Sequence, residues 1–210
     1  MKIQSYTISE KHKTFIWLPP RCATNFISWV LAYFEFSSVL IDTEINEIQT
    51  IRPNQSTHFS HCTIFPQNHE ELSFICAIRN PYHRVLSMYQ SLFEHPYYSR
   101  NQHKSVENFE QYVNDRIVKD KSLWFEFSSS FKDRSPDYLI RTENLYDDIL
   151  KIPFIRDSDL NSSGILKNFC DKKINQSYTQ LNPEEYLTPR IKEIIHSLSS
   201  DHFDLFGYER

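Results

Sequence analysis

The sequence predicts an α/β fold in which a central, mostly parallel sheet is flanked by helices. Two stretches, residues 15–31 and 73–89, carry this prediction. Each begins with an apolar run of strand length, passes through proline, and continues with apolar residues at helical spacing. In folds built from such strand-to-helix units, ligands bind at the carboxyl edge of the sheet, where the turns gather.

Length and composition favour a single domain that spans residues 1–210. Of the 210 residues, 40% are hydrophobic and 15% aromatic, which is enough for a single well-packed core. The net charge of −4 favours neither nucleic acid nor a membrane as a partner, so anion recognition must be local. The two glycines of the chain exclude a glycine-rich nucleotide loop. The oligomeric state is left open.

Cysteine content and the amino-terminal residues bear on location. The four cysteines are widely spaced, which suits reduced thiols rather than a disulfide framework. Residues 1–13 are polar and charged, and no apolar run approaches the length of a membrane span. We therefore expect a cytoplasmic protein.

The turn after the first strand has the layout of a phosphate-binding loop. The strand ends at Pro19 and Pro20, and a short polar segment then leads into the helix. The first N–H groups of a helix lack intrahelical partners and its dipole is positive there, so the main chain binds anions. Arg21 adds a full charge, and Thr24 and Asn25 add side-chain donors. A proline turn before a Thr- or Asn-capped helix explains the same residues without a ligand.

The second turn carries a sharper pattern. Pro81 suits the first turn of a helix, and Val85 and Tyr89 belong to an apolar stripe that faces the core. Arg79 stands at the end of the strand, and Ser87 falls on the polar side of the helix. We expect these two side chains to bind one anion over the start of this helix.

These segments resemble the sulfotransferases that use 3′-phosphoadenosine 5′-phosphosulfate (PAPS). In that family a Pro-Lys-Ser-Gly-Thr-Thr-Trp-like loop holds the 5′-phosphosulfate, and residues 20–26 match it loosely. An Arg-(Asn/Asp)-Pro-x-x-Arg-x-x-Ser-x-Tyr segment holds the 3′-phosphate, and this chain matches it in full. The matching residues are Arg79, Asn80, Pro81, Arg84, Ser87 and Tyr89.

The carboxyl-terminal part is similar to the carbohydrate branch of that family. In this branch a Tyr-containing run ending in Thr-Pro precedes a helix, and a Phe-Gly-Tyr segment ends the chain; here these are residues 186–189 and 201–208. The resemblance covers most of the chain, with residues 97–134 unmatched. It implies the three-layer, P-loop-like sulfotransferase fold and transfer of a sulfuryl group from PAPS to a sugar or polysaccharide hydroxyl. It also implies 3′-phosphoadenosine 5′-phosphate (PAP) as product, with no metal.

The resemblance assigns roles to residues of this chain. Arg79 and Ser87 hold the 3′-phosphate, Phe26 lies near adenine, and Arg21 stabilises charge on the transferred group. The 5′-phosphosulfate loop consists of Arg21, Cys22, Ala23, Thr24, Asn25 and Phe26. Further on, Glu143 matches a residue that is usually structural in the family.

Two histidines in the predicted strand at residues 56–65 are candidates for the general base. His58 and His61 are three residues apart, so on a strand they point to opposite faces and only one faces a given site. In the carbohydrate branch a His-bearing strand supplies the base, and it precedes the 3′-phosphate strand by about the same number of residues as here. This makes His61 the first choice and His58 the second. A histidine without function is the alternative. A metal site including Cys62 lacks further ligands at a familiar zinc spacing.

Two departures from the family pattern bear on activity, although Arg21 keeps the positive charge and the enzyme interpretation is retained. Ala23 stands where the family mostly has Gly, and at a positive φ its methyl group costs about 1 kcal/mol or more. Arg21 replaces the usual Lys, exchanging a point charge for a planar fork. The rival interpretation is a non-catalytic nucleotide-binding or interaction protein of the same fold. Other phosphate chemistries fail on the sequence: the Gly-Lys-(Ser/Thr) string of an NTPase is missing, and Ser28 stands where a Cys22-based phosphatase needs Arg.

The remaining periodicity predicts further elements. A polar linker is expected at residues 46–55 and a loop at 157–164. The other expected elements are strands at 39–41 and 138–141, a capped helix at 105–119, an apolar-faced segment at 123–131, and a last helical region from 182 with Ile191, Ile194, Ile195 and Leu198 as its buried stripe.

Overall fold

A computed structural model describes residues 3–19, 21–42, 47–51, 69–92, 105–118, 134–171 and 181–209. The chain forms two compact units. The first comprises Met1–Ile78 and Arg134–Asn175, and the second comprises Arg79–Asp133 and Gln176–Arg210. The single domain expected over residues 1–210 stays a prediction. The segments predicted at residues 56–65 and 123–131 lie outside the described residues.

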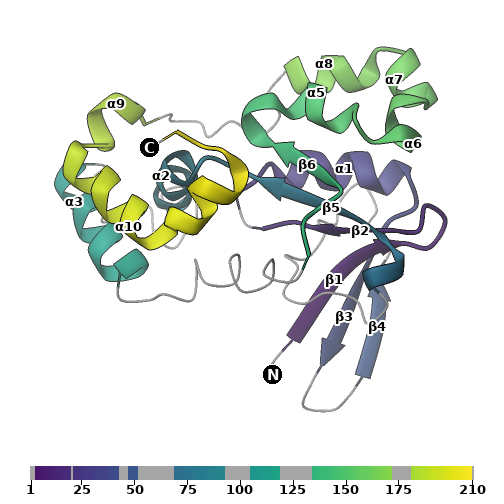
Figure 1. Cartoon of the computed structure of the whole chain (residues 1–210), viewed down its shortest axis with the longest axis horizontal. Helices are drawn as coiled ribbons and strands as arrows, with labels where there is room; N and C mark the ends of the chain where they lie inside the picture. The colour runs from purple at the N-terminus through teal and green to yellow at the C-terminus, as the bar shows by residue number, and fades with distance from the viewer. Residues whose placement is uncertain are drawn as a thin grey trace. The chain divides into compact units, whose positions relative to one another are not determined.

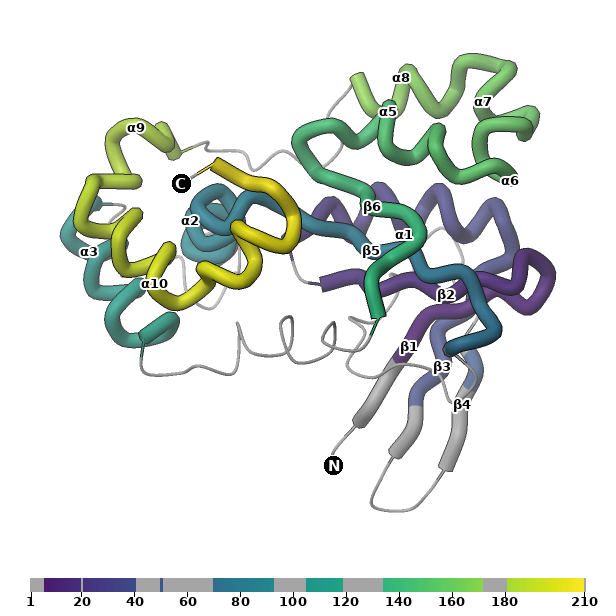
Figure 2. The backbone as a smooth tube through the Cα atoms, viewed as in Figure 1, coloured from purple at the N-terminus to yellow at the C-terminus, as the bar shows by residue number. Residues whose placement is uncertain are grey.

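The first unit contains a six-stranded mixed sheet in the order β4-β3-β1-β2-β5-β6 (Figure 1). Its strands are β1 (Ile3–Ser9), β2 (Thr14–Trp17), β3 (Ser37–Asp42), β4 (Glu47–Ile51), β5 (Ser73–Ile78) and β6 (Tyr138–Arg141). The pairs β2–β5 and β5–β6 are parallel. The other three pairs are antiparallel, and Figure 2 shows β1, β3 and β4 running side by side. The α/β class is therefore confirmed, with predicted strands in β2, β3, β5 and β6.

The prediction of a mostly parallel sheet was wrong for β1, β3 and β4. A turn at residues 10–13 joins β1 to β2, and a connection this short pairs its strands antiparallel. The sequence did not predict β1, because polar side chains occupy its inward-facing positions and no hydrophobic alternation results. Thr7 and Ser9 are buried, and the Ser9 hydroxyl donates to the carbonyl of Phe34. The strand β4 occupies the expected linker and pairs with β3.

Helices flank this sheet within the first unit. They are α1 (Thr24–Tyr33), α5 (Leu145–Ile149), α6 (Pro153–Arg156), α7 (Asp159–Ser162) and α8 (Ile165–Asp171), with 3₁₀ turns at His69–Glu71 and Thr142–Asn144. Figure 1 shows α5 to α8 gathered beside β6. The loop predicted at residues 157–164 contains the single turn of α7, which buries Leu160. One apolar residue in a polar run gives no periodicity, which is why the sequence did not predict this helix.

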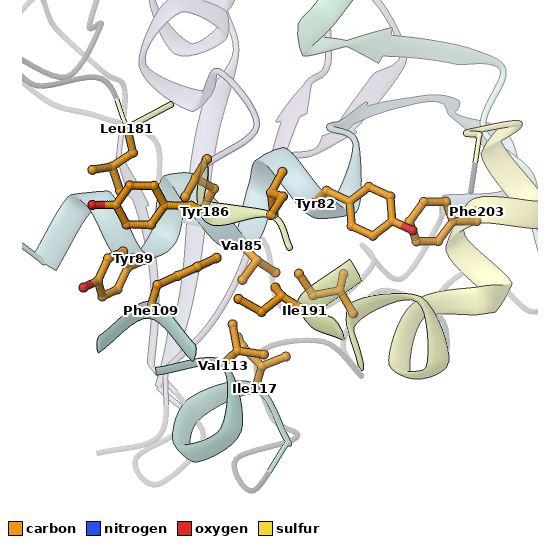
Figure 3. Packing of buried hydrophobic residues seen from close by; sticks show 13 residues of the cluster. Tyr82, Val85, Tyr89, Phe109, Val113, Ile117, Leu181, Tyr186, Ile191 and Phe203 are labelled. Atoms are coloured by element: carbon orange, nitrogen blue, oxygen red, sulfur yellow. The ribbon is translucent and has the colours of Figure 1, made fainter. Parts of the chain in front are cut away.

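The second unit is helical. It contains α2 (Pro81–Leu92), α3 (Val106–Tyr112), a π-helical turn at Val113–Val118, α9 (Pro183–Tyr186) and α10 (Pro189–Phe206). The predicted stripes meet in one apolar cluster: α2 contributes Val85 and Tyr89, α3 contributes Phe109, and α10 contributes Ile191 and Ile195 (Figure 3). Ser105 caps α3 as expected, because its hydroxyl accepts from the Asn108 N–H at 3.1 Å.

The long helix α10 bends at Ser199, whose backbone is non-helical at φ −135°. The Ser199 hydroxyl donates to the carbonyl of Ile195, four residues earlier. Hydroxyl groups that bond back to the preceding turn often bend helices. The last turns of α10 therefore follow their own direction within the second unit. Among the described helices, none combines the length and the apolar character needed to cross a bilayer.

Candidate functional site

The turn between β2 and α1 has alternating backbone handedness. Arg21 and Ala23 have positive φ values of 66° and 54°, whereas Cys22 between them is not among the positive-φ residues and Thr24 begins the helix. In such an alternation successive N–H groups point into one concavity, which is the nest that binds anions in phosphate loops. The turn thus has the backbone handedness of such a nest without glycine.

The start of α1 is capped by no side chain. Its N-cap residue is Ala23, in the left-handed region, and a methyl group accepts no hydrogen bond from the first turn. Thr24, which was expected to donate to the ligand, instead donates its hydroxyl proton to the carbonyl of Pro19 at 3.0 Å. That bond ties the beginning of the turn to the beginning of the helix. An anion is the partner that suits uncapped N–H groups at a helix start.

The predicted loop residues differ in exposure. Arg21 is half-buried, Asn25 is exposed, and Cys22 and Thr24 are buried. Phe26, expected near adenine, is only 4% exposed. Its assignment to adenine stays a prediction, as do the ligand roles of the other loop residues.

The start of α2 is built in the opposite way. The Asn80 side-chain oxygen accepts from the N–H of Tyr82 at 3.0 Å and of His83 at 3.5 Å, and the Asn80 carbonyl accepts from the N–H of Arg84. Pro81 follows as the first helical residue, as predicted. Because the cap already satisfies these first-turn N–H groups, an anion here depends on side chains. Arg79 and Ser87 are the predicted ones, and they belong to the second unit with Asn80.

Within the first unit, the strands that lead into the two turns end at one edge of the sheet. The parallel strands β2 and β5 pair with Trp17 opposite Cys76, so both end at the same edge. The Thr142 hydroxyl donates to the Ile78 carbonyl at 2.9 Å and anchors the end of β5. Arg79 is the next residue in the chain. This is the edge at which α/β sheets bind ligands.

A buried imidazole that the sequence did not single out contacts the second turn. His202, near the end of α10, is 7% exposed and forms a hydrogen bond with the backbone of Arg79. Burial, reinforced by the charge of Arg84, lowers the pKa of His202 to about 3, so this ring is neutral at physiological pH. The signal available in the sequence was only a histidine inside the terminal run at residues 201–208.

A buried carboxylate follows β6 and is structural. The fully buried Asp148 carboxylate accepts from the Arg141 guanidinium at 2.8 Å and from the Lys151 ammonium at 2.6 Å. Burial raises the pKa of Asp148, but these hydrogen bonds outweigh burial and lower it to about 2. Glu143, the residue matched to a position that is usually structural in the family, is exposed, and its role stays a prediction.

The last predicted residues to be located are the candidate bases and the possible metal ligands. His58, His61 and Cys62 lie outside the described residues, as does Pro20 of the first loop. Across the ranges that the structure describes, no three His, Cys, Asp or Glu side chains gather into a metal-binding group.

Comparison of the chain with protein-family models, curated proteins and solved structures yields no match in any of the three.

Proposed function

We propose that this chain is a PAPS-dependent sulfotransferase with the P-loop-like sulfotransferase fold. The observation that carries the proposal is the β2-to-α1 turn, where alternating φ signs at residues 21–24 precede a helix whose N-cap residue is Ala23. Backbone of this form binds phosphate or sulfate oxygens, and Arg21 adds a cation beside it. The full Arg-Asn-Pro-x-x-Arg-x-x-Ser-x-Tyr match at residues 79–89 supports a second phosphate in the same ligand.

Each turn takes one end of the donor in this proposal. Residues 21–26 bind the 5′-phosphosulfate, and Arg79 and Ser87 bind the 3′-phosphate. The cap on α2 supports this division, since Asn80 occupies first-turn N–H groups and leaves 3′-phosphate recognition to side chains. An arginine suits that task because its guanidinium pairs with two phosphate oxygens at once.

The proposed reaction is in-line transfer to a hydroxyl. The acceptor oxygen forms a bond to sulfur while the bond from sulfur to the 5′-phosphate oxygen breaks, and PAP leaves. His61, with His58 as second choice, takes the acceptor proton; imidazole has a suitable pKa without special tuning. Arg21 stabilises charge that spreads over the transferred oxygens, as cations do in phosphoryl transfer. No metal takes part in this scheme.

The proposed acceptor is a sugar or polysaccharide, on the strength of the similarity of the carboxyl-terminal runs to the carbohydrate branch. The proposed location is the cytoplasm, on the strength of the few dispersed cysteines. A panel of sugars, phenols and peptides with hydroxyl groups, each incubated with donor, distinguishes the acceptor classes.

Transfer of label from [³⁵S]PAPS to an acceptor tests the function. We expect label in the acceptor with wild-type protein, and a fall of about 10²-fold or more with Arg21→Ala, since one preorganised charge contributes on that order. Arg21→Lys, which keeps the charge, is the matched control and should retain more activity than the alanine variant. Donor binding without transfer to any acceptor would favour the rival, a non-catalytic nucleotide-binding protein whose loop carries Ala23.

The 3′-phosphate assignment has its own test. Arg79→Ala should weaken PAP binding by about 1.5–3 kcal/mol and leave adenosine 5′-phosphate binding nearly unchanged, because only PAP carries the phosphate that loses its charged partner. Calorimetric titration with both nucleotides measures the difference. Equal weakening of both would make Arg79 a structural residue.

A further inference from the structure

The end of α10 holds a neutral imidazole against the backbone of the second turn. The hydrogen bond between His202 and the Arg79 backbone raises the pKa of the imidazole, so its backbone partner is an acceptor, the carbonyl oxygen. The ring itself is held by two aromatic neighbours. Phe206 meets it edge-on at 4.6 Å between centroids, and Tyr208 stacks parallel to it at 6.0 Å.

Those aromatic neighbours are fixed by the end of the helix. Gly207 closes α10 with φ 69°, a left-handed value that glycine adopts without cost, and the Tyr208 N–H returns to the carbonyl of Phe203 at 3.1 Å. Phe203 in turn belongs to the apolar cluster of the second unit. The imidazole therefore has little freedom, and its bond holds the Arg79 carbonyl in one direction.

The peptide that follows this carbonyl leads directly into the α2 cap. Asn80 holds the first turn of α2 through both its side chain and its carbonyl. His202 on one side and the α2 cap on the other thus fix the backbone from which the Arg79 side chain extends. A cation held in one orientation binds its ligand more tightly than a mobile one, because less conformational freedom is lost on binding.

We propose that His202 is a positioning residue that aims Arg79 at the 3′-phosphate of the donor. This inference rests on the function proposed above. A neutral ring is suited to the role, because it donates a hydrogen bond without adding a third positive charge beside Arg79 and Arg84. His202 contacts no reacting group in this role, so its effect is on selectivity between nucleotides rather than on the chemical step.

The test is the ratio of the dissociation constant for adenosine 5′-phosphate to that for PAP, measured by calorimetry on the full chain. His202→Leu removes the donor, and we expect the ratio to fall about tenfold, while adenosine 5′-phosphate binding changes little. His202→Asn returns an N–H donor at a similar position and should restore much of the ratio. The matched control is His196→Leu, in the same helix and packed on Phe203 at 5.2 Å, which should leave the ratio unchanged.

The outcomes separate this inference from the proposed function. A ratio that His202→Leu leaves intact, while Arg79→Ala lowers it, overturns the positioning role alone. A ratio near one in wild type overturns the proposed donor and the positioning role with it. Should His202→Leu fail to fold, Tyr208→Leu loosens the ring while keeping its N–H, and a several-fold fall in the ratio supports the role; an unchanged ratio overturns it.

Discussion

At the scale of one residue, Ala23 places a non-glycine residue in the left-handed region just before α1. Its φ of 54° lies in the left-handed region, where an L-residue with a Cβ is disfavoured by about 1–2 kcal/mol. Whether Ala23 had a positive φ was left open by the sequence, since a capped helix explained residues 20–26 equally well. The alternation of φ signs requires a particular backbone conformation at four successive residues. The local amino-acid composition does not determine that conformation.

Substitution at Ala23 tests this strain. Ala23→Gly should raise the free energy of unfolding by about 1 kcal/mol, because glycine removes the clash of the methyl group. Ala32→Gly, within the same helix α1, should lower it by a similar amount through lost helix propensity. Urea denaturation of both variants measures the two signs. A loss of stability in both would contradict the left-handed conformation at Ala23.

The candidate base is also tested at the residue scale. His61→Ala should lower turnover by roughly 10²–10⁴ while donor affinity stays intact, because only proton removal is lost. His58→Ala is the paired control. Normal turnover of His61→Ala with reduced turnover of His58→Ala would move the role to His58.

At the scale of elements, Asp148 joins β6 to α5. Besides its ion pairs, it accepts from the backbone N–H of Arg141 at 3.0 Å and from the Asn144 amide at 3.2 Å. The carboxylate is therefore stabilised in its ionised form in the folded state, and its depressed pKa of about 2 makes stability depend on pH. A group of this kind stabilises the fold above its unfolded pKa near 4 and loses that contribution as the pH falls.

The predicted result is a difference between wild type and Asp148→Asn. Above pH 4 wild type should be more stable by about 2 kcal/mol, and the gap should narrow as the pH falls toward 2. Denaturant unfolding at pH 7, 4 and 2.5 measures it. A gap that stays constant over this range would mean that the ionised pair contributes nothing to folding.

Elements with strong periodicity could be predicted, and those held by tertiary contacts could not. The helix α2 combines Pro81 in its first turn with a regular apolar stripe, so its start could be predicted, and the structure adds a side-chain cap at Asn80. The strand β1 exposes no such pattern, because its buried Thr7 hydroxyl lies against that of Ser38, a contact that exists only after folding. Buried polar residues that hydrogen-bond to one another produce no hydrophobic pattern in the sequence, so a strand that contains them is not predicted.

At the scale of the whole molecule, the chain divides its proposed donor residues between two units. The nest at residues 21–24 belongs to the sheet-containing unit, and Arg79, Ser87 and His202 belong to the helical one. The sequence predicted a phosphate-binding loop at residues 21–26 and the pair Arg79 and Ser87, since each turn follows a strand. It did not predict His202, because more than a hundred residues separate it from Arg79 and the contact exists only in the folded chain.

Calorimetric titration of the wild-type chain with PAP and with adenosine 5′-phosphate tests directly whether this chain binds the proposed donor through its 3′-phosphate. The two ligands differ by the 3′-phosphate alone. We expect PAP to bind about 10- to 150-fold more tightly, because one charge-assisted contact is worth about 1.5–3 kcal/mol. Equal affinity for the two nucleotides, or binding of neither, would contradict it.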